Sequence, residues 1–400
     1  MKIFRIYYRL IIFLLGTILH WTFILGSKVI HYEVYLIRSG RLGHLALNTE
    51  WFLRKRRIQL GKKVYAIIIS PKLVKSNYVA NLYLLSEYLN VLEKEKNIIV
   101  IKSTILHRIL HNKKININER TNYYLPNHPW NNDWSKMPRV LNLSEENINK
   151  GREMLKKIGV KDSTKIVAIF ARDTEYLSNR FPDKNWSYHD YRNADINTYI
   201  KSIEYLIKNG YTVIRVGSSV NKKVSFSHEK FIDYPFTNIR SEFLDIIIVY
   251  LSKFVIGTTS GAVDTAVVFN KPFLGVNFAP FTESPFGKYD QYIQKKLVDI
   301  NSNKIIKFKD FIGRDLSNTY NSKKFRSQYD VTYLDNTEDE IFNAVIEFED
   351  RIKDTPSDQN NECSDHLNEY HEKYWKKMPC KLINPKISCS WLKKNKDLYI

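Results

Sequence analysis

Residues 253–278 read KFVIGTTSGAVDTAVVFNKPFLGVNF, and this stretch decides the fold class. Its apolar runs at 254–256 and 273–277 predict two strands, because short apolar runs bounded by turn residues are typical of buried strands. Residues 262–269 are helix-forming and apolar, and the Asn-Lys-Pro that follows them stops a helix. The order strand, turn, helix, strand is a βαβ unit, which predicts parallel strands in an α/β sheet.

The turn of this unit, Gly257 to Gly261, consists of small and hydroxyl-bearing residues. The amino end of a helix carries unpaired backbone N–H groups and the positive end of the helix dipole. Small residues let a phosphate approach the backbone, and hydroxyl groups add donors. The pattern predicts a phosphate site at Thr259, Ser260 and Gly261. The commoner alternative is an ordinary turn with a Ser or Thr helix cap.

The composition is that of a globular protein with an excess of positive charge. The chain has 400 residues, 44% of them hydrophobic, and a formal net charge of +20. This length suits two ordinary domains, and the basic excess suits anionic lipid, nucleic acid or a phosphorylated ligand. Lysine is spread along the chain without the compact basic and aromatic run of a nucleic-acid module, so no nucleic-acid partner is predicted.

The cysteines and acids predict neither a disulfide framework nor a metal site. The three cysteines, Cys363, Cys380 and Cys389, match no metal-ligand spacing, and their odd number argues against a disulfide framework. Reduced thiols in a cytosolic compartment are the simplest interpretation. No D-x-D pair stands at the end of a predicted strand, so no metal and no cofactor are expected.

Residues 1–30 form a segment that is first basic and then apolar. A nearly continuous apolar run from Leu10 to Leu25 is slightly shorter than the roughly 20 residues that cross a bilayer. It is either a short anchor, a helix lying in the membrane interface, or a buried core helix. Because reduced thiols and a phosphate ligand fit the cytosol, we predict a membrane-associated hydrophobic helix at the cytoplasmic face of the inner membrane.

Residues 31–143 alternate predicted strands and helices, which indicates a parallel α/β sheet. The first strand leads into a turn with Gly40 and Gly43, where the missing side chains let a ligand approach the backbone. His44 stands near the start of the next helix, where it could accept a proton from a hydroxyl nucleophile. Glu50 follows one and a half turns later. The alternative for His44 is a capping or packing role.

Residues 144–350 form a second predicted α/β domain. Ligands of open α/β sheets gather beyond the carboxyl ends of the strands. Arg172 follows one predicted strand, Arg215 lies on another, and Gly217 stands in the turn after it. A guanidinium fork matches phosphate oxygens, although a salt bridge is the alternative for Arg172. Glu283, in the loop after the βαβ unit, is either a ligand of a sugar hydroxyl or a solvated acid.

Five motifs follow one another along the chain. They are R-L-G-H-L with N-T-E (41–50), F-A-R-D-T-E-Y-L (170–177), H-D-Y-R-N-A-D-I (189–196), V-I-R-V-G (213–217) and G-T-T-S-G with F-N-K-P (257–272). Together they resemble a bacterial family of mostly uncharacterised GT-B-type glycosyltransferases, associated with surface-polysaccharide and O-antigen gene clusters. The resemblance covers roughly residues 32–350. This chain departs from the family in one respect: related proteins often place an acid before the Ser-Gly pair of the turn, where Thr259 stands in this chain.

The resemblance implies two Rossmann-like domains that face a cleft: an acceptor domain at 31–143 and a donor domain at 144–350, followed by a polar tail or helix at 351–400. It implies metal-independent transfer of a sugar from a nucleotide sugar to a membrane-associated glycan or lipid-linked acceptor in surface polysaccharide biosynthesis. The implied donor contacts are Arg172, Arg215, Gly217, Thr259, Ser260, Gly261 and Glu283. The implied acceptor side consists of Gly40, Gly43 and Glu50, with His44 as the base.

Two other functions fit the same sequence. A nucleotide-sugar epimerase could share the fold, because fold does not fix function. A non-enzymatic, membrane-bound scaffold of polysaccharide assembly could keep the fold and the basic surface without catalysis. An epimerase acts without an acceptor, and a scaffold needs neither Arg172 nor Ser260, so experiments can separate the three.

Overall fold

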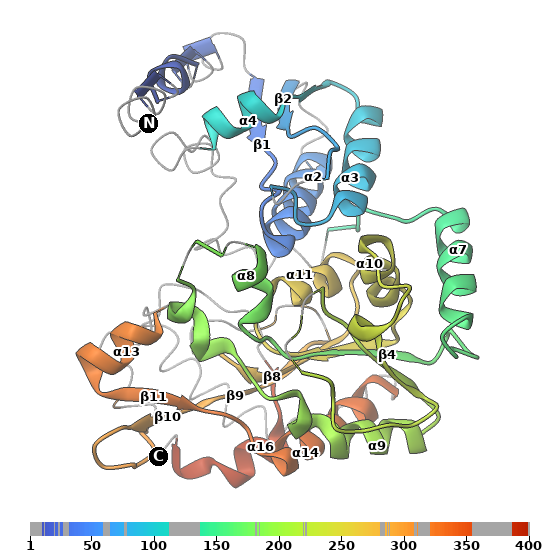
Figure 1. The fold of residues 1–400 in the computed structure, drawn as a ribbon, viewed down its shortest axis with the longest axis vertical. Coiled ribbons are helices and arrows are strands. Elements are labelled where there is room, and N and C mark those ends of the chain that lie inside the picture. Colours follow the sequence, from blue (N-terminus) through green and yellow to red (C-terminus); the bar gives the residue numbers. More distant parts are fainter. Residues whose placement is uncertain are drawn as a thin grey trace. The chain divides into compact units, whose positions relative to one another are not determined.

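Two compact units make up the described part of the chain (Figure 1). The first unit extends up to Leu143, and the second begins at Ser144. Both contain parallel sheets with helices between the strands, which confirms the predicted α/β class. The computed structural model describes residues 10–11, 13–19, 21–22, 25–26, 32–58, 65–75, 78–111, 137–180, 182–183, 185–218, 220, 222–280, 285, 287, 289–307, 310, 321–353 and 386–398.

The first unit is built on a three-stranded parallel sheet in the order β1-β2-β3. Its elements are β1 (Tyr32–Leu36), η1 (His44–Asn48), α2 (Thr49–Ile58), β2 (Tyr65–Ser70), α3 (Leu82–Lys94), β3 (Ile98–Lys102) and α4 (Thr104–Leu110). Helix α3 begins where the Asn81 side chain accepts a hydrogen bond from the Leu84 N–H. Its buried residues recur at helical spacing between Leu84 and Leu92 and form the face that packs in the core.

The second unit contains a seven-stranded sheet in the order β12-β9-β8-β7-β4-β5-β6, with every neighbouring pair parallel. The strands are β4 (Ile166–Phe170), β5 (Thr212–Arg215), β6 (Phe231–Asp233), β7 (Phe254–Gly257), β8 (Phe273–Phe278), β9 (Gln291–Gln294) and β12 (Lys386–Ile387). A separate antiparallel pair consists of β10 (Lys296–Asp299) and β11 (Val331–Leu334). Because β5 lies on one side of β4 and β7 on the other, the strand order reverses there, which is where ligands bind in open α/β sheets.

The βαβ unit predicted at 253–278 is present as β7, α11 (Gly261–Val268) and β8. The other helices of the unit are α7 (Glu145–Lys156), α8 (Glu175–Arg180), η2 (Ser187–Arg192), η3 (Ile196–Tyr199), α9 (Ile200–Lys208), η4 (Tyr234–Phe236), α10 (Glu242–Leu251), α13 (Ser322–Tyr329), α14 (Glu338–Lys353), α16 (Cys389–Lys394) and η7 (Lys396–Leu398). Helices α10 and α11 cover one face of the sheet, and α9, α14 and α16 cover the other (Figure 1). The sheet is thus buried on both faces.

Residues 386–398, which lie in the predicted polar tail or helix at 351–400, belong to the second unit. Strand β12 pairs with β9. The carboxylate of Glu347 on α14 accepts hydrogen bonds from the N–H groups of Cys389 and Ser390 at the start of α16. An acid at a helix amino end is favourable because of the helix dipole. Since Trp391 is also buried, this segment contributes to the core.

The hydrophobic helix predicted within residues 1–30 lies partly outside the described residues. Those described between Leu10 and Gly26 are helical, and Leu19 packs against the apolar cluster that contains Leu36 and Leu110. Within the described part of the chain, no helix is both long and apolar enough to cross a bilayer. Several apolar side chains of the segment are about half exposed, namely Leu10, Ile11, Leu14, Leu15, Ile18, Trp21 and Leu25.

Gly257 ends β7 beside Phe170, its partner on β4. A methyl group on Gly257 would come within 2.4 Å of the buried Phe170 ring, which stacks on Phe273. We predict that Gly257→Ala lowers the unfolding free energy of the second unit by about 1–3 kcal/mol, because overpacking displaces this ring. Hydrogen exchange of the β4 and β7 amides measures the loss. Gly40→Ala in the first unit, whose new methyl group would meet nothing nearer than 3.9 Å, is the control, read from the β1 amides of its own unit. An equal loss there would contradict the packing explanation.

Candidate functional site

Two threonines connect the turns at the carboxyl edge of the second sheet. The Thr258 hydroxyl accepts a hydrogen bond from the Arg172 N–H at 3.0 Å, which joins the turn after β7 to the turn after β4. The Thr259 hydroxyl accepts one from the Ala279 N–H at 3.2 Å, which joins the same turn to the residue after β8. The turns that end three neighbouring strands are therefore held together at this edge.

Ser260 is the N-cap of α11. Its hydroxyl oxygen accepts a hydrogen bond from the Ala262 N–H at 3.3 Å, as in an ordinary capped helix. A hydroxyl that accepts one bond still has a proton to donate, and both Thr259 and Ser260 are partly exposed. The turn therefore offers two hydroxyl donors at the positive end of the helix dipole, and Gly261 adds no side chain that would obstruct an anion.

Arg172 follows β4 and is oriented by uncharged oxygen atoms. Its Nη1 donates to the backbone oxygen of His189 at 3.1 Å and to the side-chain oxygen of Asn193. Burial, together with the neighbouring Arg192, lowers the pKa of Arg172 to about 10. The guanidinium is therefore charged at neutral pH, partly removed from water, and held in place without neutralisation by these two partners. A group in this condition favours the approach of an anion.

A buried lysine that the sequence analysis missed lies close to Arg172. Lys295 follows β9, and its Nζ donates to Asp335 Oδ1 at 2.6 Å and to the backbone oxygen of Asn193 at 2.5 Å. Burial lowers the pKa of Lys295, Asp335 opposes this shift, and the charge of Arg172 adds to it. Arg172 and Lys295 are thus both bonded to Asn193, and Asp335 balances the charge of Lys295.

Arg215 is occupied by contacts within the fold. It is 2% exposed, and its Nη1 donates to the Lys222 backbone oxygen at 2.6 Å and to Asp233 Oδ1 at 3.2 Å. This buried ion pair fixes the segment after β5 against β6. Gly217 lies in a tight turn, where a methyl group would come within 2.8 Å of Val220 Cγ1. The structure therefore gives these two residues structural roles near the edge and does not present Arg215 to a ligand.

Several residues singled out in the sequence lie outside the described residues. Glu283 is one, and Cys363 and Cys380 are two others. Cys389 is partly buried, and its N–H donates to Glu347 Oε1 at 2.7 Å. Among the residues that the structure describes, no group of three or more His, Cys, Asp or Glu side chains could hold a metal ion.

In the first unit, a buried histidine fixes the turn after β1. Nε2 of His107 donates to the Ile37 backbone oxygen at 2.5 Å, which leaves Nδ1 to accept from the Tyr78 hydroxyl, also at 2.5 Å. Burial lowers the pKa of His107 to about 3, which agrees with a neutral ring. Gly40 and Gly43 lie in this turn. Gly43 has an ordinary helical φ of −60°, so its backbone conformation does not require glycine.

His44 begins η1 directly after this turn. Its Nδ1 lies 3.4 Å from Asn48 Oδ1, and a proton assigned to Nδ1 leaves Nε2 with a free lone pair. Burial, together with the charges of Arg38 and Arg41, lowers the pKa of His44 to about 4. The ring is therefore neutral at physiological pH and able to accept a proton, as a base requires. The contact with Asn48 suits a packing role equally well.

Glu50 is buried on α2 and holds residues 137–143 in the first unit. Its Oε1 accepts hydrogen bonds from Arg54 Nε and from the Val140 N–H, both at 2.8 Å. Its Oε2 accepts one from the Leu141 N–H at 3.2 Å. The side chains of Glu50 and Arg54 are both 0% exposed. The structure therefore places Glu50 inside the unit, with both carboxylate oxygens occupied.

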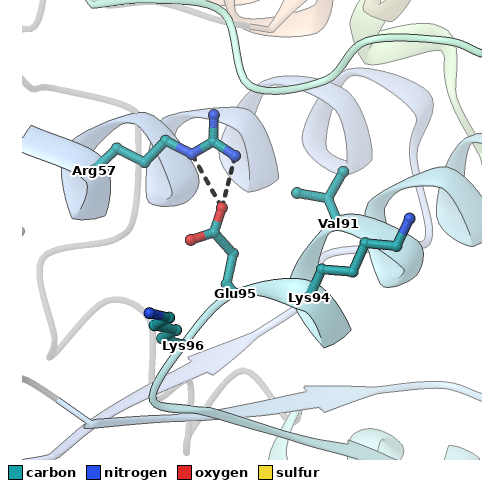
Figure 2. A pocket seen from close by; sticks show the side chains of 5 residues that line it. All are labelled: Arg57, Val91, Lys94, Glu95 and Lys96. Atoms are coloured by element: carbon teal, nitrogen blue, oxygen red, sulfur yellow. Dashed lines mark hydrogen bonds and ion pairs between the residues drawn. The ribbon is translucent and has the colours of Figure 1, made fainter.

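A pocket of the first unit lies apart from these residues. Figure 2 shows its lining side chains, Arg57, Val91, Lys94, Glu95 and Lys96, at the ends of α2 and α3. Arg57 donates through Nε and Nη2 to one Glu95 oxygen, at 3.0 and 2.7 Å. The pocket precedes β3 along the chain and so lies toward the amino ends of the strands. Ligands of such sheets bind at the opposite edge, so we do not assign this pocket to the site.

Comparison with protein-family models and with curated proteins gave no match. Among solved structures, the chain is similar to the glycosyl transferase family 9 protein from Veillonella parvula DSM 2008, with a TM-score of 0.37 and 11% sequence identity. The similarity covers 66% of this chain and 85% of that one. A likeness of this size does not establish a shared activity.

We predict that Glu50→Gln destabilises the first unit by about 3–5 kcal/mol, because it leaves the buried Arg54 guanidinium without its charged partner. Hydrogen exchange of the α2 amides reports the loss. Glu93→Gln is the matched control. Glu93 pairs with Lys102 at the surface, with 42% of its side chain exposed, and an exposed pair contributes at most about 1 kcal/mol. Similar losses in the two variants would be inconsistent with a structural role for Glu50.

The pKa of His44 also predicts how stability depends on pH. Its pKa is about 4 in the fold and 6.5 in an ordinary environment. Between these values the unfolded chain binds a proton that the folded chain does not, so stability conferred by His44 is complete above about pH 6.5 and falls as the pH decreases toward 4. His44→Gln cannot titrate, and we predict a smaller loss of first-unit stability between pH 7 and pH 5 than in the wild type.

Hydrogen exchange of the β1 amides at both pH values measures this difference. The same comparison at pH 8 is the control, because His44 is neutral in both states there and any difference reports packing alone. His107, whose pKa is lowered in the same direction, keeps a slope in the variant. An unchanged slope in His44→Gln would show that His44 does not titrate in this way.

Proposed function

We propose that this protein is a metal-independent glycosyltransferase of the GT-B type, which moves a sugar from a nucleotide sugar to a membrane-associated glycan or lipid-linked acceptor in surface polysaccharide biosynthesis. One observation carries the proposal. At the switch point of the second sheet, Arg172 is bonded to Thr258 and lies next to the hydroxyl-bearing start of α11. A guanidinium and a helix amino end at the carboxyl edge of parallel strands are groups that bind a diphosphate.

The donor diphosphate binds against residues 259–261, with Arg172 beside it. As the bond between the sugar and the diphosphate breaks, negative charge grows on the leaving phosphate oxygen. The Arg172 guanidinium and the dipole of α11 stabilise that charge without a metal ion. Lys295 lies at the same edge but contributes less, because Asp335 already pairs with it. Arg215 takes no part in this step, because Asp233 already pairs with it.

The acceptor hydroxyl is activated by His44 in the first unit. Its neutral ring accepts the hydroxyl proton as the oxygen attacks the sugar. A pKa of about 4 makes His44 a weak base in the free protein, and a nearby negative charge on the substrates raises that pKa. Gly43 lies directly before His44, and Gly40 lies in the same turn, where a methyl group would meet nothing nearer than 3.9 Å.

We place this activity at the cytoplasmic face of the inner membrane. The supporting observation is the set of half-exposed apolar side chains between Leu10 and Leu25. Exposed apolar surface of this kind is unfavourable in water and suits the interface of a lipid bilayer. A lipid-linked acceptor would be presented at the same surface.

The proposal is tested by thermal unfolding of the purified protein with UDP-glucose, UDP-N-acetylglucosamine, GDP-mannose and dTDP-rhamnose. A nucleotide sugar that binds only the folded state raises Tm. If none of these compounds shifts Tm, the donor assignment is wrong. Product analysis in the absence of an acceptor separates a transferase from an epimerase, because only the epimerase converts the sugar under that condition.

We predict that Arg172→Ala weakens nucleotide-sugar binding about ten- to hundredfold, because it removes a charged hydrogen-bond donor to the diphosphate. Isothermal titration calorimetry measures the change. Arg152→Ala on α7 is the matched control, since that guanidinium bonds to Asn149 at the surface of the same unit. Unaltered affinity in Arg172→Ala would place the donor elsewhere, and an unaltered biological role would favour the scaffold.

A further inference from the structure

A pocket of about 370 Å³ lies in the second unit, between η2, the turn after β9, and the segment formed by α13 and β11. Its size is at the lower end of the range for small-molecule sites. It is lined by polar side chains on one side and by aromatic rings on another. Apart from Lys295, its lining residues have no role in the proposed function.

The aromatic side of the pocket is rigid. The ring centroids of Tyr191, Phe325 and Tyr333 lie 5.1 to 5.9 Å apart. The Ser322 hydroxyl accepts a hydrogen bond from the Tyr191 N–H at 2.9 Å, which fixes the start of α13 against η2. The pocket is therefore formed before any ligand binds, and its aromatic rings offer an apolar surface to the C–H groups of a ligand.

On the polar side of the pocket, the carboxylates of Asp335 and Asp190 are each oriented by a neighbouring side chain. Lys295 Nζ donates to Asp335 Oδ1 at 2.6 Å, and the Asn193 side chain donates to Asp190 Oδ1 at 3.2 Å. The Asp335 side chain is 40% exposed. A carboxylate accepts more than one hydrogen bond, so both acids can still accept from a ligand while these contacts orient them.

The pocket is connected to the proposed diphosphate site by a chain of hydrogen bonds. Asn193 lines the pocket, and its side-chain oxygen accepts from Arg172 Nη1. The Arg172 N–H in turn donates to Thr258. A molecule whose diphosphate contacts Arg172 therefore has this pocket within reach of the groups attached to that diphosphate.

We propose that the pocket binds a hydroxyl-bearing ring of the donor, with Asp335 and Asp190 accepting hydrogen bonds from its vicinal diol. This inference rests on the proposed function and extends that function by naming the part of the donor that binds in the pocket. The diol belongs either to the ribose or to the transferred sugar, which share this chemistry.

Other ligand classes fit the pocket less well. The buried ammonium of Lys295 opposes a divalent cation between the two acids, while the acids oppose a free anion. A neutral ring with several hydroxyl groups satisfies carboxylate acceptors and ammonium or guanidinium donors together. Its C–H face can lie against the aromatic side.

Asp335→Asn tests the proposal by calorimetry. The probes are the compound of the panel above that raises Tm most and the matching nucleoside diphosphate. We expect Asp335→Asn to weaken binding about ten- to hundredfold, because it removes a charged acceptor. An equal loss for both probes assigns the ribose to the pocket, and a loss confined to the nucleotide sugar assigns the transferred sugar.

Asp339→Asn is the matched control. Asp339 also pairs with a lysine of the same unit, Lys201, whose Nζ lies 2.5 Å from Asp339 Oδ1, but it lies outside the pocket. The affinity of Asp339→Asn for both probes should therefore equal that of the wild type. Thr332→Val, which replaces a hydroxyl lining the pocket by a methyl group, is a second variant in case Asp335→Asn does not fold. We expect it to weaken binding severalfold.

Wild-type affinity in folded Asp335→Asn, or in Thr332→Val where Asp335→Asn does not fold, would overturn the proposal and leave the proposed function standing. If the wild type binds no member of the panel, the proposed function fails first and this proposal fails with it. The two failures are therefore distinguishable. Equal losses in Asp335→Asn and Asp339→Asn would also overturn it, because the effect would then be one of general charge.

Discussion

The absence of a side chain at Gly257 is the constraint on which the carboxyl edge of the second sheet depends. Gly257 pairs with Phe170 on β4 and with Gly275 on β8, and the Phe170 ring occupies the space that a methyl group would need. The strands can therefore approach one another while this ring stacks on Phe273. The residues that follow are then close enough for the bond that places Arg172. A packing requirement inside the sheet thus positions a charged group at its edge.

The βαβ unit could be predicted because all of its signals lie within residues 253–278: two apolar runs, a turn of small residues and a helix stop. The place of Arg172 followed from a general property of parallel sheets. Lys295 could not be found in this way. It is separated by 102 residues from Asn193, its partner, and a lysine after a strand is usually solvated. Only the pairing of β9 with β8 and the approach of η2 bring it to the edge.

Arg172 and Arg215 show why residue type and strand position are insufficient to assign a site. Both lie at the ends of neighbouring strands, and the sequence assigns them the same role. The difference is that β6 places Asp233 against Arg215, whereas the Arg172 guanidinium donates to the uncharged oxygens of His189 and Asn193. For Glu50, the sequence did contain a signal of its structural role. An arginine stands four residues later on the same helix, which is a common spacing for an ion pair. The bonds of Glu50 to residues 137–143 required the structure.

Asn193 shows how the edge can hold the Arg172 guanidinium without cancelling its charge. Its backbone and side-chain oxygens accept from Lys295 and Arg172, and its amide nitrogen donates to Asp190. An amide can do both because it carries an acceptor and donors on one group. A carboxylate at this position would orient Arg172 equally well, but it would neutralise the guanidinium and repel Asp190. An apolar residue would leave the guanidinium with the His189 backbone oxygen but without the side-chain acceptor at position 193. The amide therefore helps to fix the Arg172 guanidinium and leaves its charge available to an anionic ligand, whereas Asp335 balances the charge of Lys295.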